Sequence, residues 1–343
     1  MKKSLQLNWI KITRYEFWPT WLFYLPVSVY WLYLGIKCGD LLFFIRVNKG
    51  MPFGGAIGAN KMLPLNYLPD NAKPKSLLVM SNDNLSKTIH QLEDSGISFP
   101  CIVKPNNGER GKGVTVISSR DHLISHFQSF SLPQEMIIQA FATEPLEFGV
   151  FFYFDENNRP HIPSVVMKEL LTITGDGRNT VAQLIEKNKR AMLSNRSFMA
   201  NIGQHSQKIL DKGEVLNVEP IGNHCRGTKF MNGNHLINQQ MAETFAQLAL
   251  HIPGFRYGRF DLKAQSVDSL YSGNGIKVVE VNGVNAEPAH IYDPNYGLFK
   301  AYRDLYKHMH ILYRLAKLNN SKEGRMTFIE FIENLRNHLK PIT

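Results

Sequence analysis

The stretch "PCIVKPNNGERGKGVTVI", residues 100–117, decides the fold that we expect for this chain of 343 residues. It opens with a short apolar strand that ends at Lys104 and closes with a strand rich in β-branched residues. The loop between them contains Gly108, Gly111 and Gly113, and glycine adopts the backbone conformations of tight turns most readily. The sequence therefore predicts a glycine-rich β-hairpin.

Three cations accompany this hairpin, with Lys104 on its first strand and Arg110 and Lys112 at its tip. A Walker A loop and a dinucleotide-binding loop both need a helix after their glycines, whereas a strand follows Gly113. Both classes are therefore excluded. Two interpretations remain: a loop that folds over a triphosphate with backbone N–H groups and cations, or a solvated turn.

A second polar group lies about 150 residues further along the chain. Asp261 belongs to "GRFD", and Glu280 and Asn282 belong to "VVEVN". Residues two apart on a strand point to one face, and Asp261 joins them if the two strands are neighbours. Two carboxylates and an amide oxygen suit a magnesium ion that bridges nucleotide phosphates. The alternative is a surface position for Glu280, but the strand around it is apolar, and a carboxylate there needs a partner or a metal.

The elements around these motifs are those of a mixed α/β chain. Alternating and continuous apolar runs predict strands at 75–81, 135–141, 147–156, 159–170, 256–265 and 275–282. Helical periodicity predicts helices at 84–96, 119–130, 236–251, 298–318 and 325–339, and a capping box of Thr180 and Gln183 predicts another through about Met192. Glycine, proline and asparagine in 50–75 predict connecting loops.

Together these motifs resemble the ATP-grasp superfamily, particularly D-alanine–D-alanine ligase and the ligase half of cyanophycin synthetase. The resemblance extends over residues 80–300 and includes "IIQAFATEPLEFGV" at 137–150 and "TGDGRNTVAQLIE" at 174–186, in the order found in those enzymes. It implies an α/β (α+β) ATP-grasp fold, in which two α/β subdomains grip ATP. It also implies ATP and two magnesium ions as cofactors.

The resemblance assigns roles residue by residue. It implies that Lys104 contacts the phosphates, that the backbone of Ala140 and Phe141 meets adenine, and that Glu147 takes the ribose hydroxyls. Arg259 would stabilise the developing oxyanion. The magnesium ligands would be Asp261, Glu280 and Asn282, and the hairpin residues expected over ATP are Gly108, Arg110, Gly111, Lys112 and Gly113.

The sequence departs from the family pattern at three points. Gln139 stands where an acidic residue is usual, which affects the choice between adenine and guanine. A second phosphate-binding lysine is expected, and Lys168 in "VVMKEL" is the best candidate. The N-terminal domain of D-alanine–D-alanine ligase is replaced by an aromatic segment, so the substrate is not transferred with the fold.

The loop "GNHCRGTKF", residues 222–230, occupies the place of a loop near the reacting acyl phosphate in related ligases. His224 and Arg226 in it are candidates to bind a carboxylate or the transferred phosphoryl group, with Arg226 as the catalytic candidate. A surface loop with a satisfied histidine is the competing interpretation.

Composition and charge limit the remaining classes. Three scattered cysteines without CxxC spacing argue against disulfides and zinc and favour a reducing, cytoplasmic location. The net charge is +10, and the first 50 residues carry seven cations against Glu16 and Asp40, which is half of that excess. All four tryptophans lie in the same segment. No RNA- or DNA-binding module accompanies the charge, so we expect no nucleic-acid partner.

Residues 17–36 form an uncharged run of twenty residues, long enough to span a bilayer. Pro19, Pro26 and the spread of aromatic residues instead favour a broken amphipathic hairpin at the membrane interface, peripheral on the inner face of the cell membrane. Packing of these aromatics as a core helix or an oligomer interface, as in a homodimer, is the alternative.

These observations predict four regions and one activity. The regions are the basic aromatic segment 1–75, ATP-grasp subdomains at 76–140 and 141–320, and a C-terminal helix at 321–343. The resemblance implies an ATP-dependent ligase that joins a small-molecule carboxylate to an amine through an acyl phosphate. If the aromatic segment binds a membrane, one substrate is amphipathic or lipid-linked. The rival functions are a phosphotransferase of the same fold and a membrane-bound nucleotide-binding protein without ligase chemistry.

Overall fold

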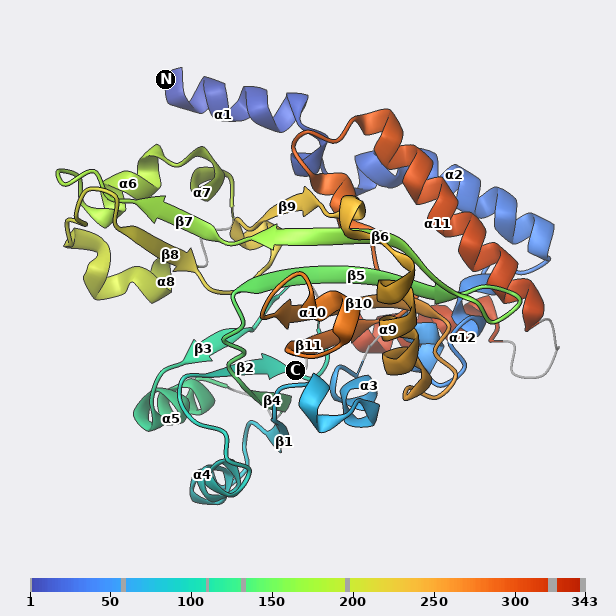
Figure 1. Ribbon diagram of the computed structural model, residues 1–343, viewed down its shortest axis with the longest axis horizontal. Coiled ribbons are helices and arrows are strands. Elements are labelled where there is room, and N and C mark those ends of the chain that lie inside the picture. Colours follow the sequence, from blue (N-terminus) through green and yellow to red (C-terminus); the bar gives the residue numbers. More distant parts are fainter. Residues whose placement is uncertain are drawn as a thin grey trace.

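The computed structural model describes residues 2–56, 60–108, 111–130, 134–194, 198–319 and 326–339. Its strands form a four-stranded, a five-stranded and a two-stranded sheet (Figure 1). All strand pairs within them are antiparallel. Helices alternate with these sheets along the chain. The mixed architecture confirms the expected α/β (α+β) class.

The four-stranded sheet has the order β1-β4-β2-β3. Its strands are β1 (Ser76–Met80), β2 (Cys101–Pro105), β3 (Thr115–Ile117) and β4 (Glu135–Ala140). Two helices, α4 (Leu85–Asp94) and α5 (Arg120–Gln128), bury their apolar residues in the same cluster as this sheet. The register of β2 and β3, with Cys101 opposite Ile117, confirms the predicted hairpin.

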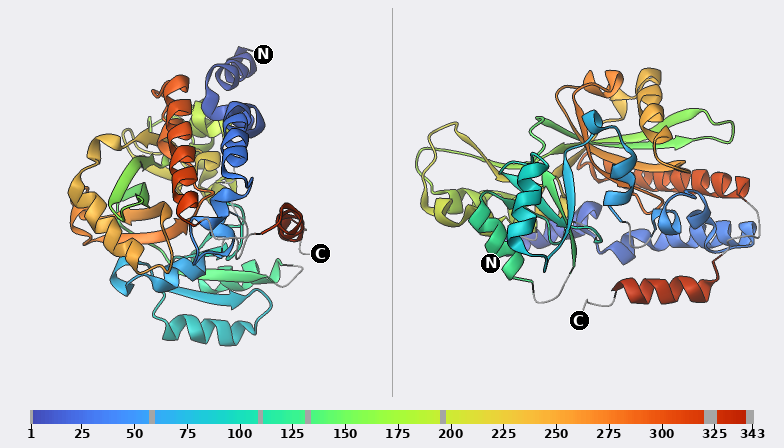
Figure 2. Two further views of the ribbon diagram at one scale, coloured as in Figure 1. Left: turned by 90° about the vertical axis from the view of Figure 1, so that its right-hand side faces the viewer. Right: turned by 90° about the horizontal axis from the view of Figure 1, so that it is seen from below.

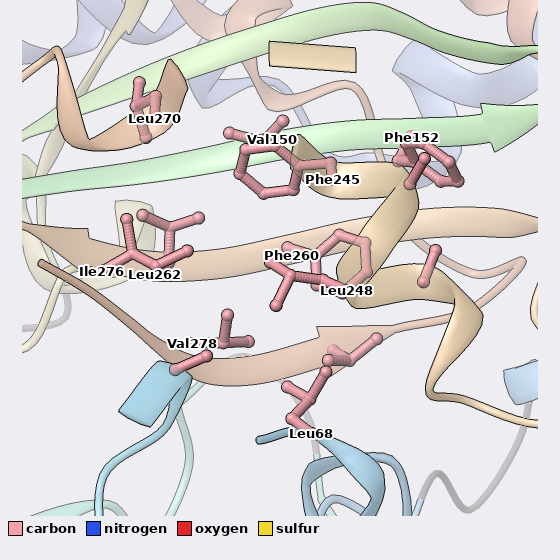
Figure 3. Close-up of a cluster of buried hydrophobic side chains, with 14 of the residues drawn as sticks. Leu68, Val150, Phe152, Phe245, Leu248, Phe260, Leu262, Leu270, Ile276 and Val278 are labelled. Carbon is pink, nitrogen blue, oxygen red and sulfur yellow. The ribbon is translucent and has the colours of Figure 1, made fainter. Parts of the chain in front are cut away.

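The five-stranded sheet has the order β11-β10-β5-β6-β9. Its strands are β5 (Leu146–Phe154), β6 (Pro160–Glu169), β9 (Lys229–Asn232), β10 (Tyr257–Ala264) and β11 (Ile276–Asn282). Figure 3 shows one face of this sheet packed against α9 (Gln239–Leu250), with Phe260 near Phe245 and Leu262 beside Ile276. Because successive strand residues point to opposite faces, Asp261 lies on the other face.

The two-stranded sheet is an insertion between β6 and β9. It pairs β7 (Leu171–Thr174) with β8 (Val215–Glu219) and shares a buried cluster with α6 (Val181–Lys187), α7 (Lys189–Leu193) and α8 (Met199–Ile202). The capping box of Thr180 and Gln183 is confirmed at the start of α6. The predicted single helix through Met192 is wrong, because Asn188 interrupts it and its side chain caps α7.

The aromatic segment begins with α1 (Lys2–Thr13), followed by a 3₁₀ turn at Tyr15–Phe17 and α2 (Thr20–Cys38). The expected broken hairpin is wrong, since α2 is one helix that contains Pro26. Proline removes one backbone hydrogen bond from a helix, but Phe23 and Val27 bury their side chains against α11 (Leu298–Leu318). Both views of the molecule show α2 and α11 side by side (Figures 1 and 2).

The opposite face of α2 is exposed and apolar. Trp21, Val29 and Ile36 are 71%, 67% and 70% exposed, whereas Phe23 and Leu34 are buried. Among the described residues, no helix combines the length and the apolar character that crossing a membrane requires. The aromatic segment therefore has one face packed in the molecule and one face toward solvent.

The remaining elements complete the second unit. Residues 50–75, expected as loops, contain α3 (Met62–Tyr67), and Leu65 and Leu68 enter the core of the five-stranded sheet. The predicted helix at 298–318 is confirmed, and the last one is α12 (Phe328–Leu339), seen in Figure 2, whose Phe331 ring lies edge-to-face with the ring of Phe44. A single-turn helix, α10 (Ser269–Ser272), joins β10 to β11. The boundaries at 75, 140 and 320 stay predictions.

Candidate active site

A cavity of about 720 Å³ lies between the four-stranded and the five-stranded sheets. One end, the cationic end, is lined by Lys61, Lys104, Lys168, Arg259, Asp261 and Glu280. The other, the aromatic end, is lined chiefly by Glu16, Phe17, Trp18, Tyr24, Glu287 and Tyr292. Four cations face two carboxylates at the cationic end, so this end carries a surplus of positive charge.

A two-by-two patch of side chains on β10 and β11 forms the floor of the cationic end. Asp261 lies directly opposite Glu280, and Arg259 lies directly opposite Asn282. Residues two apart on each strand share a face, so all four side chains point to the same side of the sheet. The two strands are neighbours, as the sequence required for the trio of Asp261, Glu280 and Asn282 to meet.

Asp261 is the centre of a buried ion-pair cluster. Its carboxylate accepts hydrogen bonds from Arg259 Nη2 at 2.9 Å and from Asn282 Nδ2 at 2.8 Å, and Lys168 Nζ lies 3.3 Å from Oδ1. Burial alone would raise the pKa of Asp261, but the charges of Arg259 and Lys168 outweigh it and hold the pKa below its usual value. Asp261 is therefore ionised at neutral pH.

Glycine at position 149 makes room for this cluster. Gly149 lies opposite Asp261 in the pairing of β5 with β10. A Cβ atom at this position would approach Asp261 Oδ1 to 3.0 Å and Val166 Cγ1 to 2.8 Å. Any larger residue would therefore displace the Asp261 carboxylate from the floor of the cavity.

Lys104 connects the two sheets across the cavity. Its Nζ donates to Gln139 Oε1 and to the Val279 carbonyl oxygen, both at 3.0 Å. The register of β10 and β11 shifts so that Val279 is left without a partner on β10, and this bulge leaves its carbonyl free for Lys104. Burial lowers the pKa of Lys104 to about 8, although the nearby charge of Glu280 opposes the shift.

The residues present fit magnesium bound together with nucleotide phosphates. Within the described part of the chain, no hydrogen bond or ion pair engages the Glu280 carboxylate, so its oxygens are available. The described residues hold no group of three or more His, Cys, Asp and Glu side chains that could bind a metal alone. Magnesium commonly takes one or two protein carboxylates and completes its shell with phosphate oxygens and water.

Lys168, the candidate for a second phosphate-binding lysine, lines the cationic end. It lies opposite Glu147 on β5, and its Nζ donates to Glu147 Oε1 at 3.0 Å. Burial would lower the pKa of Lys168, but Asp261 and Glu147 raise it overall. Glu147 Oε2 is buried without a hydrogen-bond partner, but Glu147 is not among the lining residues, so its contact with the ribose hydroxyls stays a prediction.

The hinge residues lie outside the cavity lining. Ala140 ends β4, and the ring of Phe141 packs under Lys263 Nζ at 5.2 Å. Gln139 is buried and contacts Lys104. Their contacts with adenine stay predictions.

The glycine-rich hairpin closes the cavity through Gly108 and Gly111, which both line it. Gly111 and Gly113 have φ values of +69° and +73°, a conformation that favours glycine. A Cβ atom on Gly111 would meet Asn223 Nδ2 at 3.1 Å, so the hairpin tip touches the 222–230 loop. Lys112 and Gly113 are not among the lining residues. Arg110 lies outside the described residues.

The two candidate residues in the 222–230 loop, His224 and Arg226, occupy different positions relative to the cavity. The Arg226 guanidinium donates to buried Glu219 at 3.2 Å and to the Val114 carbonyl oxygen at 3.0 Å, which ties the loop to the hairpin. His224 lines the cavity, and its Nε2 lies 3.1 Å from Glu16 Oε2. The structure therefore brings His224, and not Arg226, to the cavity surface, and the catalytic role of Arg226 stays a prediction.

Sequence reasoning missed the aromatic end and Lys61. Glu16, Tyr24, Glu287 and Tyr292 come from the N-terminal segment and from the loop after β11. The only signal for Glu287 is its position five residues after Asn282 in "VNGVNAEPAH". The sequence signal for Glu16 is stronger, since Glu16 is one of two acidic residues in the basic segment of residues 1–50.

Comparison with known proteins identifies a family to which part of the chain is similar. Residues 59–147 match the model of the RimK-like ATP-grasp domain. This stretch, 89 of the 343 residues, is similar to the ATP-grasp superfamily. The match spans the glycine-rich hairpin, β4 and the start of β5, and the ATP-grasp fold agrees with the antiparallel sheets on either side of the cavity. No curated protein matches the sequence significantly.

Several solved structures of ligases and synthetases are similar in fold to this chain at low sequence identity. D-alanine–D-alanine ligase from Bacillus anthracis is 14% identical, with a TM-score of 0.45, and the alignment covers 81% of this chain and 71% of that one. VanG D-Ala:D-Ser ligase from Enterococcus faecalis is 12% identical over 81% and 64% of the two chains, with a TM-score of 0.42. A bifunctional glutathione synthetase from Pasteurella multocida is 14% identical over 72% and 36%, with a TM-score of 0.36. The chain thus spans less than two thirds of the last two proteins.

Proposed function

We propose that this protein is an ATP-dependent ligase that joins a small-molecule carboxylate to an amine and releases ADP and phosphate. The observation that carries the proposal is the placement of Asp261 and Glu280 side by side in the same cavity as Lys104, Lys168 and Arg259. Surplus positive charge suits a triphosphate, and the available Glu280 carboxylate suits the magnesium that accompanies it.

In the first step, a carboxylate oxygen of the substrate attacks the γ-phosphorus of ATP, and ADP leaves. Lys104 and Lys168 lie in the cavity to neutralise the charge on the transferring phosphoryl oxygens. Magnesium, held by Glu280, Asp261 and Asn282, would supply further charge neutralisation when bound. The hairpin backbone N–H groups would cover the phosphates.

In the second step, the nitrogen of the neutral amine attacks the acyl carbon of the acyl phosphate, phosphate leaves, and the nitrogen loses a proton to water. The developing oxyanion needs a fixed donor, and the Arg259 guanidinium is fixed on two sides. Its Nε and Nη2 donate to Asp261, and its Nη1 donates to the Glu287 carbonyl oxygen at 2.7 Å. Such bidentate fixation positions the guanidinium before the charge develops.

Glu280→Gln tests the proposal, because it removes a charge and keeps the shape. We expect ADP release to fall by roughly a thousandfold while the melting temperature stays unchanged. Glu243→Gln is the matched control, since Glu243 is exposed on α9 and away from the cavity. Normal ADP release by Glu280→Gln would contradict the assignment.

The same assay separates the ligase from the rival functions. A ligase releases ADP and free phosphate only when both an acid and an amine are present. A phosphotransferase would leave a stable phosphorylated product. Tight ATP binding without turnover against a broad panel of acids and amines would favour a nucleotide-binding protein without ligase chemistry.

We also propose that the exposed face of α1 and α2 binds the surface of an anionic membrane. Trp21, Leu25, Val29, Leu32 and Ile36 recur at helical spacing on α2, and all are at least 46% exposed. Leu5, Trp9 and Ile12 form a similar exposed row on α1. The exposed side chains of Lys11, Arg14 and Lys37 add positive charge, which complements anionic lipids.

Vesicle flotation tests this second proposal. We expect the protein to float with phosphatidylglycerol vesicles and to remain behind with phosphatidylcholine vesicles. The double variant Trp21→Glu, Val29→Glu should stay behind with both, whereas Leu250→Glu, at an exposed apolar position on α9, should float like the wild type. Equal flotation of the α2 variant and the wild type would refute the assigned face.

A further inference from the structure

The aromatic end of the cavity has the chemistry of a binding site for a primary ammonium group. Two carboxylates, Glu16 and Glu287, line it together with Phe17, Trp18 and Tyr24. Carboxylates bind ammonium by charge and hydrogen bonding, and aromatic rings attract cations through their faces. The surplus of positive charge at the cationic end is thus opposed by acidic groups at the aromatic end.

Glu287 is fixed by two hydroxyl groups, and the nearby Arg259 is the cation whose pKa its charge raises. Tyr24 Oη donates to Glu287 Oε1 at 2.6 Å, and Tyr292 Oη donates to Oε2 at 3.2 Å. No ion pair engages its side chain within the part of the chain that the structure describes. Burial, and then the charge of Glu287, raise the pKa of Tyr24 well above its usual value, so that Tyr24 remains a neutral donor.

Glu16 has a buried carboxylate oxygen that lacks a hydrogen-bond donor, which is an independent indication of a ligand at this end. Its side chain is only 4% exposed, and its Oε2 takes Arg190 Nη1 at 3.3 Å and His224 Nε2 at 3.1 Å. Its Oε1 is buried without a hydrogen bond, and the nearest cation, Arg14 Nη1, is 3.7 Å away. A buried carboxylate oxygen without a donor costs free energy, which a ligand N–H would recover.

The two carboxylates belong to one continuous wall. The ring of His224, bonded to Glu16, packs against the ring of Tyr292 with centroids 5.5 Å apart, and Tyr292 donates to Glu287. The wall reaches the cationic end, because Arg259 Nη1 donates to the Glu287 carbonyl oxygen. An ammonium group bound here lies beside the guanidinium that we assign to the oxyanion.

We infer that Glu287 and Glu16 bind a primary ammonium group of a substrate whose adjoining part is apolar or aromatic. The inference rests on the proposed ligase function and adds the substrate class. The ammonium belongs either to the amine nucleophile, which loses one proton to water before its nitrogen attacks, or to an amino acid that serves as the carboxylate substrate. Tyr24 and Tyr292 are positioning residues, since they act through Glu287.

Binding of three probes of similar shape tests the charge preference. Phenethylamine is a cation at neutral pH, 2-phenylethanol is neutral, and 3-phenylpropionate is an anion. Each is titrated into the full chain with ATP and magnesium by saturation-transfer NMR. We expect phenethylamine to bind most tightly, and Glu287→Gln to weaken it by roughly tenfold to a hundredfold while 2-phenylethanol is unaffected.

Tyr24→Phe should weaken the binding of phenethylamine several-fold and leave the binding of 2-phenylethanol unchanged, because the variant loses only the hydrogen bond that fixes Glu287. Glu243→Gln, on α9, is the control and should change neither. Preferred binding of 3-phenylpropionate, or equal binding of phenethylamine by the wild type and Glu287→Gln, would overturn the inference.

Two further measurements show which substrate carries the ammonium group and distinguish failure of this inference from failure of the proposed function. ADP release that requires phenethylamine in addition to a carboxylate assigns the ammonium to the nucleophile. Release with phenylalanine but not with 3-phenylpropionate, each with hydroxylamine present as the amine, assigns it to the acid. ATP binding by the wild type is measured separately: if ATP does not bind, the proposed function fails, and if ATP binds but ammonium shows no preference, only this inference fails.

Discussion

The cationic and the aromatic ends of the cavity are built in different ways. Asp261 and Glu280 at the cationic end stand on paired strands, where the register of β10 and β11 fixes their separation. Glu16 and Tyr24 at the aromatic end stand on the N-terminal segment, whose place depends on side-chain contacts with distant parts of the chain. The first end therefore follows from local sequence pattern and the second from tertiary packing.

This difference suggests a division of labour. The strands hold the groups that we assign to ATP, which every reaction of this kind shares. The N-terminal segment and the loop around Glu287 hold the groups that we assign to the substrate that carries the ammonium.

Among the following changes, replacement of Arg259 is expected to have the largest effect on activity, because Arg259 contacts both the cationic and the aromatic end of the cavity. Arg259→Lys keeps the charge but loses the fork that contacts Asp261 and the Glu287 carbonyl oxygen. We expect kcat for ADP release to fall by roughly a hundredfold, with a much smaller change in ATP affinity. A fall in ATP affinity alone would place Arg259 on the nucleotide and not on the oxyanion.

Glu16→Gln probes whether the N-terminal segment is anchored by its charge. The change leaves Arg190 and His224 facing a neutral amide. Burial would raise the pKa of Glu16, but His224 and Arg190 hold it low, so the ionised form stabilises the fold. We expect the free energy of unfolding in urea at pH 7 to fall by about 2 kcal/mol.

The control for this change is Glu214→Gln, which removes an exposed ion pair with Lys208 and should have a much smaller effect. Because Glu16 has a lowered pKa, its stabilising contribution is present at neutral pH and is lost as the pH falls through its folded pKa. Equal stability of Glu16→Gln and the wild type would show that packing alone holds the segment.

The pH dependence of ATP affinity probes the cationic end. Burial lowers the pKa of Lys104 to about 8, so its charge is present at pH 7 and is lost as the pH rises through 8 in the free protein. The phosphates of ATP bind the charged ammonium form of Lys104. We expect ATP affinity to fall above pH 8 by up to about tenfold per pH unit. Isothermal titration from pH 7 to 9.5 measures it, and a constant affinity over this range would contradict a Lys104–phosphate contact.

Gly111→Ala is expected to have the smallest effect. A side chain at a φ of +69° is strained, and its Cβ would press on Asn223, so the hairpin would close less readily. We expect ATP affinity to fall several-fold. Gly213→Ala is the matched control, since Gly213 has a φ of +88° but no neighbour within 4 Å. An equal loss of ATP affinity in both variants would deny the hairpin a special role.

The sequence was sufficient for features that depend on neighbours in the chain. The hairpin at 100–117, the strands around Asp261 and Glu280, and the Thr180 capping box all follow from periodicity, glycine and short-range hydrogen bonding. The closeness of Asp261 and Glu280 also follows from the sequence. Side chains alternate between the two faces of a strand, so neighbouring strands bring the residues of one face together.

The sequence was insufficient where distant contacts decide. Pro26 indicated a broken hairpin, but packing of Phe23 and Val27 on α11 maintains one helix. Strands β7, β8 and β9 were not predicted, since their short runs pair only with remote partners. Glu287 lacked a motif of its own, and only the positions of Tyr24 and Tyr292 identify it.

Trapping of the acyl phosphate tests the central claim most directly. The protein is incubated with ATP, magnesium, hydroxylamine and a panel of amino acids and other carboxylates, and the products are analysed by mass spectrometry together with ADP release. We predict a hydroxamate of one carboxylate, formed in step with ADP and absent in Glu280→Gln. ADP formation accompanied by a stable phosphorylated product, with no hydroxamate, would contradict the ligase account.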